Sequence, residues 1–158
     1  MIGGVLVRCK SRGVYILDKF DKFFMDIAHE TAKLSYCKRK QVGAVLVRDK
    51  RIIANGFNGT IPNTPNVCEC ENEHGELVTN EFTVHAEQNV LTFCAREGLS
   101  TKDSTLYVTL SPCKTCAKLL ASSGITRVVY GEEYKDTSGV DFLKTVGLNV
   151  ERYICEEK

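Results

Sequence analysis

Two short segments of this chain, His85-Ala86-Glu87 and Pro112-Cys113-Lys114-Thr115-Cys116, constrain how it can fold. One histidine and two cysteines are three ligands of the kind that zinc accepts. Three protein ligands leave the fourth tetrahedral position open, which is typical of a catalytic zinc site rather than a structural one. We therefore expect the fold to bring these two segments together.

Both segments are predicted to lie at the start of a helix. One helix is expected from near His85 to about Glu97, with Gly98 as its stop, and Pro112 suits the first turn of a helix that reaches about Ala121. Helix N-termini carry partial positive charge and unpaired N–H groups. Both features lower the pKa of a thiol and favour the thiolate form that zinc binds.

Glu87 lies two residues after the histidine, where it is placed to transfer protons rather than to bind metal. The pattern H-x-E … P-C-x-x-C is the signature of zinc-dependent nucleobase deaminases. Zinc lowers the pKa of its bound water to about 7, and we expect Glu87 to pass the proton of that water to ring nitrogen N3 and then to the leaving amine. Either half of the pattern alone is weak evidence, since C-x-x-C also occurs in redox pairs and zinc knuckles.

The composition indicates one soluble domain that acts on a small substrate. A length of 158 residues fits a single domain, and the net charge of +1 lacks the basic excess of proteins that hold long nucleic acid. The first apolar run, Gly3 to Val7, is too short for a signal peptide or a membrane span. Eight cysteines, some in C-x-C and C-x-x-C spacing, then favour a reducing, cytosolic compartment.

The order of expected elements predicts an α/β fold. We divide the chain into an N-terminal leader of unknown role, residues 1–17, and a single domain, residues 18–158. A helix, two antiparallel strands and then alternating helices and strands imply a three-layer α/β/α sandwich around a central mixed five-stranded sheet. The strands are expected at Gln41–Arg48, Arg51–Phe57, Thr105–Thr109, Arg127–Tyr130 and Asn149–Ile154; further helices at Asp18–Ser35 and Asp136–Val146; a long loop at Asn58–Asn80.

Four segments carry a resemblance to a known family. They are QVGAVLV from Gln41, GFNGT from Gly56, HAEQN from His85 and TLYVTLSPCKTCAKLLASSGITRVVY from Thr105. Over about residues 19–154 the chain resembles the deoxycytidylate (dCMP) deaminases of viruses and bacteria, within the cytidine-deaminase-like superfamily. The resemblance implies hydrolysis of dCMP to dUMP and ammonia, which supplies dUMP for thymidylate synthesis. It also implies the zinc ligands and the proton carrier already named: His85, Cys113, Cys116 and Glu87.

The same resemblance suggests substrate contacts. Asn58 matches an asparagine that holds the sugar hydroxyl, although an Asn-Gly pair is also common in turns. Tyr134 resembles a tyrosine that reaches the phosphate, and an ordinary half-buried aromatic is the alternative. Thr60 and either Arg39 or Lys40 are expected to contact the phosphate, and the alternative for the two cations is that they are solvated residues at a helix end. The Ser111 region is expected to contact the amino group.

Relatives of this type are usually homohexamers that dCTP, with Mg²⁺, activates and dTTP inhibits, and the resemblance implies both properties here. Phe93 and Arg96 occupy positions that resemble subunit contacts. The alternative is a core phenylalanine and a solvated arginine.

A second metal site is also expected, because Cys37, Cys68, Cys70 and His74 form a Cys₃His set that suits a closed structural zinc site. Some viral relatives have a second zinc near this loop, and the match is partial. The alternative is that Cys37 packs as a small apolar residue and that the other two cysteines are free thiols. Cys9, Cys94 and Cys155 are expected to be buried or incidental thiols.

Three other functions compete with dCMP deamination. A tRNA adenosine deaminase or a cytosine or guanine deaminase would share the zinc signature, and the near-neutral charge and the GFNGT segment argue against the tRNA enzyme. A deaminase that accepts dCTP is hardly distinguished by the sequence. A catalytically silent zinc module would have no need of Glu87 beside its metal.

Overall fold

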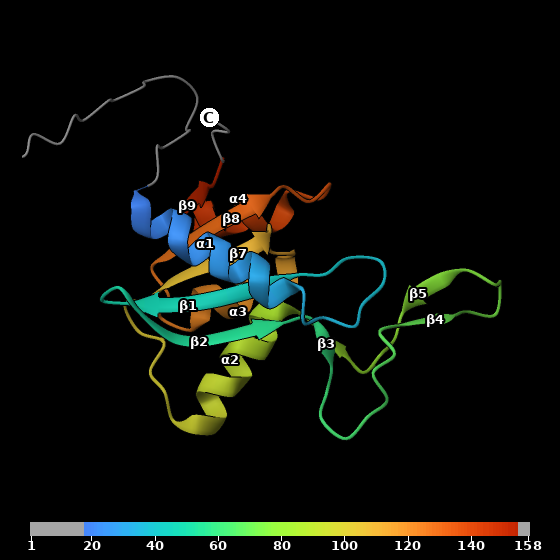
Figure 1. The fold of residues 1–158 in the computed structure, drawn as a ribbon. Helices are drawn as coiled ribbons and strands as arrows, with labels where there is room; N and C mark the ends of the chain where they lie inside the picture. The colour runs from blue at the N-terminus through green and yellow to red at the C-terminus, as the bar shows by residue number, and fades with distance from the viewer. Residues whose placement is uncertain (1–17, 155–158) are drawn as a thin grey trace, which may run out of the picture.

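A mixed five-stranded sheet forms the middle of the domain, as predicted, with the strand order β2-β1-β7-β8-β9 (Figure 1). β1 pairs antiparallel with both β2 and β7, and β8 and β9 continue the sheet in parallel. The computed structural model describes residues 18–154, so the predicted leader, Cys9 and Cys155 lie outside the described residues. The strands are β1 (Gly43–Arg48), β2 (Arg51–Phe57), β7 (Thr105–Leu110), β8 (Arg127–Glu132) and β9 (Asn149–Arg152).

Helices cover both faces of this sheet, which confirms the predicted three-layer sandwich (Figure 1). Neighbouring strand residues point to opposite faces: Val45 and Tyr107 pack under α1, and Leu46 and Leu106 pack under the other three helices. None of the described helices is long and apolar enough to cross a membrane. The helices are α1 (Lys19–Ala32), α2 (Ala86–Glu97), α3 (Lys114–Ser122) and α4 (Ser138–Thr145).

The predicted loop after β2 contains regular structure that the sequence did not reveal. β3 (Gly59–Thr60) pairs with β6 (Thr83–Val84), and β4 (Glu69–Glu71) pairs with β5 (Leu77–Thr79). The β4–β5 hairpin projects from the body of the domain (Figure 1). These strands are only two or three residues long and, apart from Gly59, half-buried or exposed, so the sequence shows no apolar period there.

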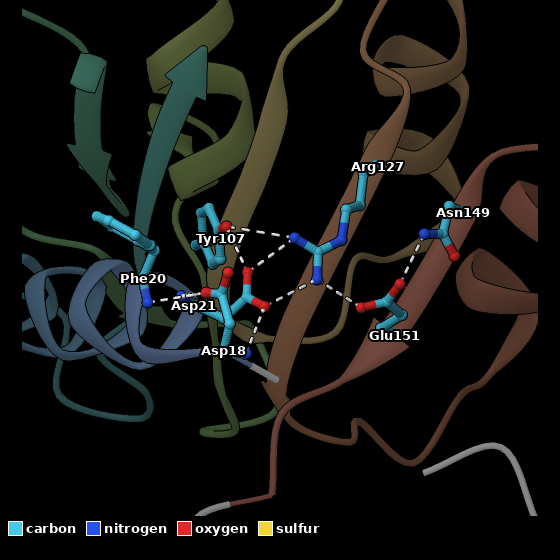
Figure 2. A network of polar contacts seen from close by, with 7 residues as sticks. All are labelled: Asp18, Phe20, Asp21, Tyr107, Arg127, Asn149 and Glu151. Carbon is cyan, nitrogen blue, oxygen red and sulfur yellow. Dashed lines mark hydrogen bonds and ion pairs between the residues drawn. The ribbon is translucent and has the colours of Figure 1, made fainter. Parts of the chain in front are cut away.

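A network of charged side chains joins α1 to three strands (Figure 2). The guanidinium of Arg127 donates to both carboxylate oxygens of Asp21, at 2.7 and 3.1 Å, and to Glu151 at 2.5 Å. The Tyr107 hydroxyl donates to Asp21 at 2.6 Å, and the Asn149 amide donates to Glu151 at 2.6 Å. The network therefore ties the first turn of α1 to β7, β8 and β9.

Opposing effects set the pKa values in this network. Burial by itself raises the pKa of the Asp21 carboxyl, but the hydrogen bonds from Arg127 and Tyr107 outweigh it and lower the pKa. Burial disfavours the charged form of Arg127, and the two carboxylates more than compensate, so the pKa of its guanidinium is raised. Each charge in the network thus has a partner of opposite sign.

Candidate metal centre and active site

The predicted metal ligands converge. Nδ1 of His85 lies 3.6 Å from Sγ of Cys113 and 3.4 Å from Sγ of Cys116, so these three atoms lie close enough together to hold a metal ion. Donors bound to tetrahedral zinc at about 2.0–2.3 Å lie roughly 3.5 Å from one another. The spacing and the nitrogen and sulfur donors therefore fit a zinc ion.

Helix starts set this geometry, as predicted. His85 is the N-cap of α2 and its backbone N–H donates to Gln88 at 2.8 Å. Cys113 is the N-cap of α3, and its sulfur accepts the backbone N–H of Cys116 at 3.5 Å. Both N-caps have extended backbone, which turns their side chains toward each other rather than along a helix surface.

The three candidate ligands shift one another's pKa values. Hydrogen bonds from Cys116 and His85 lower the pKa of the Cys113 thiol to about 3. The hydrogen bond with Cys113 raises the pKa of His85, and the same neighbouring sulfur, together with burial, raises the pKa of Cys116. A divalent cation would displace these protons, because zinc binds thiolates and neutral imidazole.

Glu87 faces this group from the first turn of α2. It lines a cavity beside the three candidate ligands, and only 4% of its surface is exposed. Burial raises the pKa of its carboxyl above the ordinary value. A carboxyl whose pKa is raised by burial keeps its proton to higher pH than an exposed one, and positioned carboxyl groups commonly transfer protons in catalysis.

The segment that carries Cys113 is fixed from two sides. The Ser111 hydroxyl accepts the backbone N–H of Tyr134 at 2.8 Å, and its own backbone N–H donates to the Glu132 carbonyl at 2.9 Å. On the other side, the first turn of α4 packs on the backbone of Pro112. A Cβ atom built on Gly139 would lie 2.0 Å from the Pro112 carbonyl oxygen, so this close approach requires glycine.

A cavity of about 530 Å³ opens beside the ligands, a size suited to a small molecule. Besides Asn58, four residues that were predicted as possible substrate contacts line it: Arg39, Lys40, Ser111 and Tyr134. Thr60 is not among the lining residues; it lies in β3, where its backbone pairs with Thr83. Further lining residues that the sequence analysis did not propose are Val42, Glu69, Thr79, Thr83, Leu110, Glu132, Glu133 and Lys135.

Asn58 lines the cavity while its amide organises the neighbouring chain. Its oxygen accepts the backbone N–H of Val42 and its nitrogen donates to the Lys40 carbonyl, both at 2.8 Å. Its backbone carbonyl accepts the Ser35 hydroxyl at 2.7 Å. A role in holding the residue 35–42 segment is thus visible, and a role in holding a sugar would use the remaining amide hydrogen or lone pair.

The four residues predicted to bind a second zinc are not gathered into one site. Cys37 and Cys68 form a disulfide, with their Cα atoms 5.1 Å apart, whereas Cys70 is a free, exposed thiol. His74 lies in the exposed turn of the β4–β5 hairpin. A disulfide sulfur is not the thiolate that zinc binds, so the described arrangement crosslinks the loop instead. It also differs from the expected reduced state of the thiols.

Phe93 and Arg96 form a local contact on α2. The guanidinium carbon of Arg96 lies 5.3 Å from the ring centroid of Phe93, which is half-buried against the main core. Arg96 also pairs with Glu97 at 2.7 Å and is exposed. These contacts lie within one chain and do not test the predicted subunit interface.

Comparisons with known proteins agree with this site. Residues 18–132 match the family model of the cytidine and deoxycytidylate deaminase zinc-binding region. The deoxycytidylate deaminase of Mycobacterium phage D29 is 39% identical over 72% of this chain and 95% of that protein, and ComE operon protein 2 of Bacillus subtilis is 35% identical over 87% and 73%. The crystal structure of dCMP deaminase from cyanophage S-TIM5, in complex with dCMP and dUMP, superposes with a TM-score of 0.80 at 38% identity, covering 88% of this chain and all of that one.

Proposed function

This chain belongs to the cytidine and deoxycytidylate deaminase family, and on that premise we propose that it hydrolyses dCMP to dUMP and ammonia. The observation that carries the proposal is the convergence of three zinc ligands with the buried Glu87 at the wall of one cavity. The substrate assignment is supported by the similarity to the phage D29 enzyme and to the S-TIM5 enzyme that holds dCMP and dUMP.

His85, Cys113 and Cys116 would hold the zinc ion, which when bound lowers the pKa of water to about 7 and makes it a nucleophile at neutral pH. Deamination requires a water oxygen to add to C4 of the cytosine ring. Glu87 accepts a proton from the water and delivers one to N3. A second proton passes through Glu87 to the amino nitrogen, so that the C4–N bond breaks, ammonia leaves and C4 keeps the oxygen.

The cavity wall is proposed to position the rest of the nucleotide. Asn58 faces the sugar, the Ser111 region faces the amino group, and Tyr134 and Arg39 face the 5′-phosphate. Asn58→Ala is expected to raise KM for dCMP by about tenfold, because it removes a substrate contact and also releases the 40–42 backbone. An unchanged KM and kcat would leave Asn58 as a turn residue alone.

The decisive experiment measures turnover of dCMP by purified, zinc-loaded protein, beside cytidine, CMP, dCTP and a tRNA substrate. Production of dUMP from dCMP is the expected result. Consumption of another of these substrates in place of dCMP would mean that the protein has a related deaminase activity, such as tRNA adenosine or dCTP deamination. No turnover of any of them with zinc bound would leave a silent zinc module.

Activation by dCTP with Mg²⁺, inhibition by dTTP, assembly as a homohexamer and a cytoplasmic location are proposed on the sequence resemblance alone. A titration of dCTP–Mg²⁺ and of dTTP into the dCMP assay, with sedimentation of the protein at each step, tests the first three. Rates and sedimentation that do not respond to either nucleotide would remove the regulatory proposal and keep the enzyme.

The number of zinc ions per chain tests the second metal site. With the Cys37–Cys68 disulfide intact we expect one zinc ion, held by the catalytic ligands. If a dithiol reductant raises the content to two, then Cys37 and Cys68 do bind metal in the reduced chain. A content of one before and after reduction would reject the second site.

A further inference from the structure

Three consecutive basic residues, Lys38, Arg39 and Lys40, lie between α1 and β1, and the last two line the cavity. All three are exposed. Lys40 forms an ion pair with Glu132 across the cavity, and in the part of the chain that the structure describes the guanidinium of Arg39 has no carboxylate partner. These residues, here called the basic segment, offer positive charge where a phosphate group would enter.

The backbone around the basic segment is fastened at several points although it forms no helix or strand. The disulfide anchors it before Lys38, and the Asn58 amide holds its far end through the Lys40 carbonyl and the Val42 N–H. The Gln41 side chain donates to the Ser35 carbonyl at 2.7 Å. A surface loop that only exposed its charges to solvent would need none of these contacts.

The carboxylate of Glu69 binds the backbone of the basic segment between these two anchors. It accepts the backbone N–H of Lys38 at 3.1 and 3.2 Å, one bond to each oxygen, and the backbone N–H of Arg39 at 3.1 Å. Hydrogen bonds from N–H groups to an ionised acceptor are stronger than neutral ones. Both donors belong to the basic segment, so Glu69 fixes its backbone without using the side chains of Arg39 and Lys40, the two residues of the segment that line the cavity.

Glu69 is itself held in place by the loop after β2. It is the first residue of β4, where its backbone pairs with Thr79. The preceding residue, Cys68, is buried, and its carbonyl accepts the backbone N–H of Asn80 at 2.7 Å and the hydroxyl of Thr83 at 3.1 Å. These contacts therefore hold the base of the hairpin in place at Glu69.

We propose that Glu69 is a positioning residue for phosphate recognition: it orders the basic segment so that Arg39 and Lys40 bind the 5′-phosphate of the substrate. This inference rests on the proposed function, because it requires a substrate that carries a phosphate. It gives the β4–β5 hairpin, which carries Glu69, a part in substrate selection.

A simpler role for Glu69 predicts the opposite change in phosphate binding when its carboxylate is removed. If Glu69 acted only through its negative charge, it would repel a phosphate at the same end of the cavity, and its removal would improve binding. If Glu69 positions the basic segment, its removal frees the backbone of Lys38 and Arg39 and weakens phosphate binding. The direction of the change therefore distinguishes the two roles.

The experiment compares wild-type protein with Glu69→Ala, Glu69→Gln and the control Glu71→Ala, an exposed residue at the other end of the same strand. For each protein, KM for dCMP is measured together with the inhibition constants of dUMP and deoxyuridine, which differ only by the phosphate. The inhibition constant of deoxyuridine divided by that of dUMP measures how much the phosphate contributes to binding. Zinc content and melting temperature show whether each variant is folded.

We expect Glu69→Ala to raise KM for dCMP and to reduce the inhibition ratio by about tenfold, the effect of losing hydrogen bonds to a charged group. The inhibition constant of deoxyuridine and kcat should change by less than about twofold. Glu69→Gln keeps one acceptor oxygen and should fall between wild type and Glu69→Ala, and Glu71→Ala should match wild type. Should Glu69→Ala not fold, the Glu69→Gln variant carries the same test.

The inference is overturned, and the proposed function still stands, if Glu69→Ala prefers dUMP over deoxyuridine as strongly as the wild type does, or more strongly. A wild-type protein that does not turn over dCMP, or that binds dUMP no better than deoxyuridine, would instead contradict the proposed function and remove the basis of the inference. A double variant adds a check, because Glu69→Ala should weaken dUMP binding little further in a protein that already carries Arg39→Ala.

Discussion

Two groups of ionisable side chains lie at opposite ends of the parallel strands β7 and β8. The Asp21–Arg127–Glu151 network lies where these strands begin, and the His85–Cys113–Cys116 group lies just after β7 ends. In the first group each charge faces one of opposite sign. In the second, three electron-pair donors point at a common centre beside the carboxyl of Glu87, and none of the four is a permanent cation.

The difference teaches how to tell a structural cluster from a reactive one. A closed network satisfies its own charges and needs nothing from outside, so it stabilises the fold and has no chemistry to offer. A convergent set of donors is electrostatically incomplete until a cation joins it, and that requirement is itself the evidence for a metal site. Substitutions in the two groups should consequently affect different measurements.

The largest expected effect is on metal content. Cys113→Ala removes one of the three proposed zinc ligands and should abolish both stoichiometric zinc binding and dCMP turnover, since two ligands hold zinc far more weakly than three. Elemental analysis of the purified variant measures the zinc content. Cys70→Ala, which alters an exposed free thiol, is the control and should keep both properties. Full zinc content in Cys113→Ala would mean that the ligands are misassigned.

Glu87→Gln should separate metal binding from catalysis. The amide has nearly the same shape but cannot carry a proton between water and the ring, so kcat should fall by about 10²–10⁴-fold with zinc content unchanged. Steady-state kinetics on dCMP measures the fall. The exposed cavity residue Glu133 is a matched control, and Glu133→Gln should keep most of the activity. Near-normal turnover by Glu87→Gln would refute its role as the proton carrier.

Arg127→Met should show the reverse pattern: lower stability with zinc content and the chemical step preserved. It leaves the carboxylates of Asp21 and Glu151 buried without a cation, which should reduce the free energy of unfolding by about 2–3 kcal/mol, less than for a fully buried pair because the Arg127 side chain is 24% exposed. Denaturant titration of the zinc-loaded protein measures the loss. Unchanged stability would show that the network contributes nothing net to the fold.

The same network should also make stability depend on pH, with a smaller effect than that of Arg127→Met. Because the pKa of Asp21 is lowered in the folded state, its stabilising contribution is present above the unfolded value of 3.8 and is lost as the pH falls through the folded value. Asp21→Asn should thus be less stable than wild type at neutral pH, and the gap should narrow below about pH 3.8. Thermal melts at several pH values measure the gap. A gap that stays constant with pH would exclude Asp21 as the titrating group.

The sequence predicted the parts of this molecule that depend on local patterns. The end of the helix at Gly98 and the start of the next helix after Pro112 follow from glycine and proline signals, and the buried strands follow from runs such as Gly43–Arg48. Because the motif spacing fixes the ligands, His85, Cys113 and Cys116 could be assigned to one site before their distances were known.

Features that depend on long-range pairing were not predicted. Asp21 and Arg127 are 106 residues apart, and nothing local marks either as half of an ion pair. The β4–β5 hairpin, the disulfide and the contact of Glu69 with Lys38 likewise join segments whose own patterns are short or polar. Thr60 shows the related limit of a motif, because closeness in sequence to Asn58 did not bring it to the cavity.

The Cys37–Cys68 disulfide also changes what a single backbone cut would do to this protein. The bond closes a covalent ring that contains β1, β2 and the exposed stretch 61–67. A broad-specificity protease that nicked this stretch would open the ring without separating the two pieces. The nicked protein would migrate as one molecule on a denaturing gel until a reductant released both fragments.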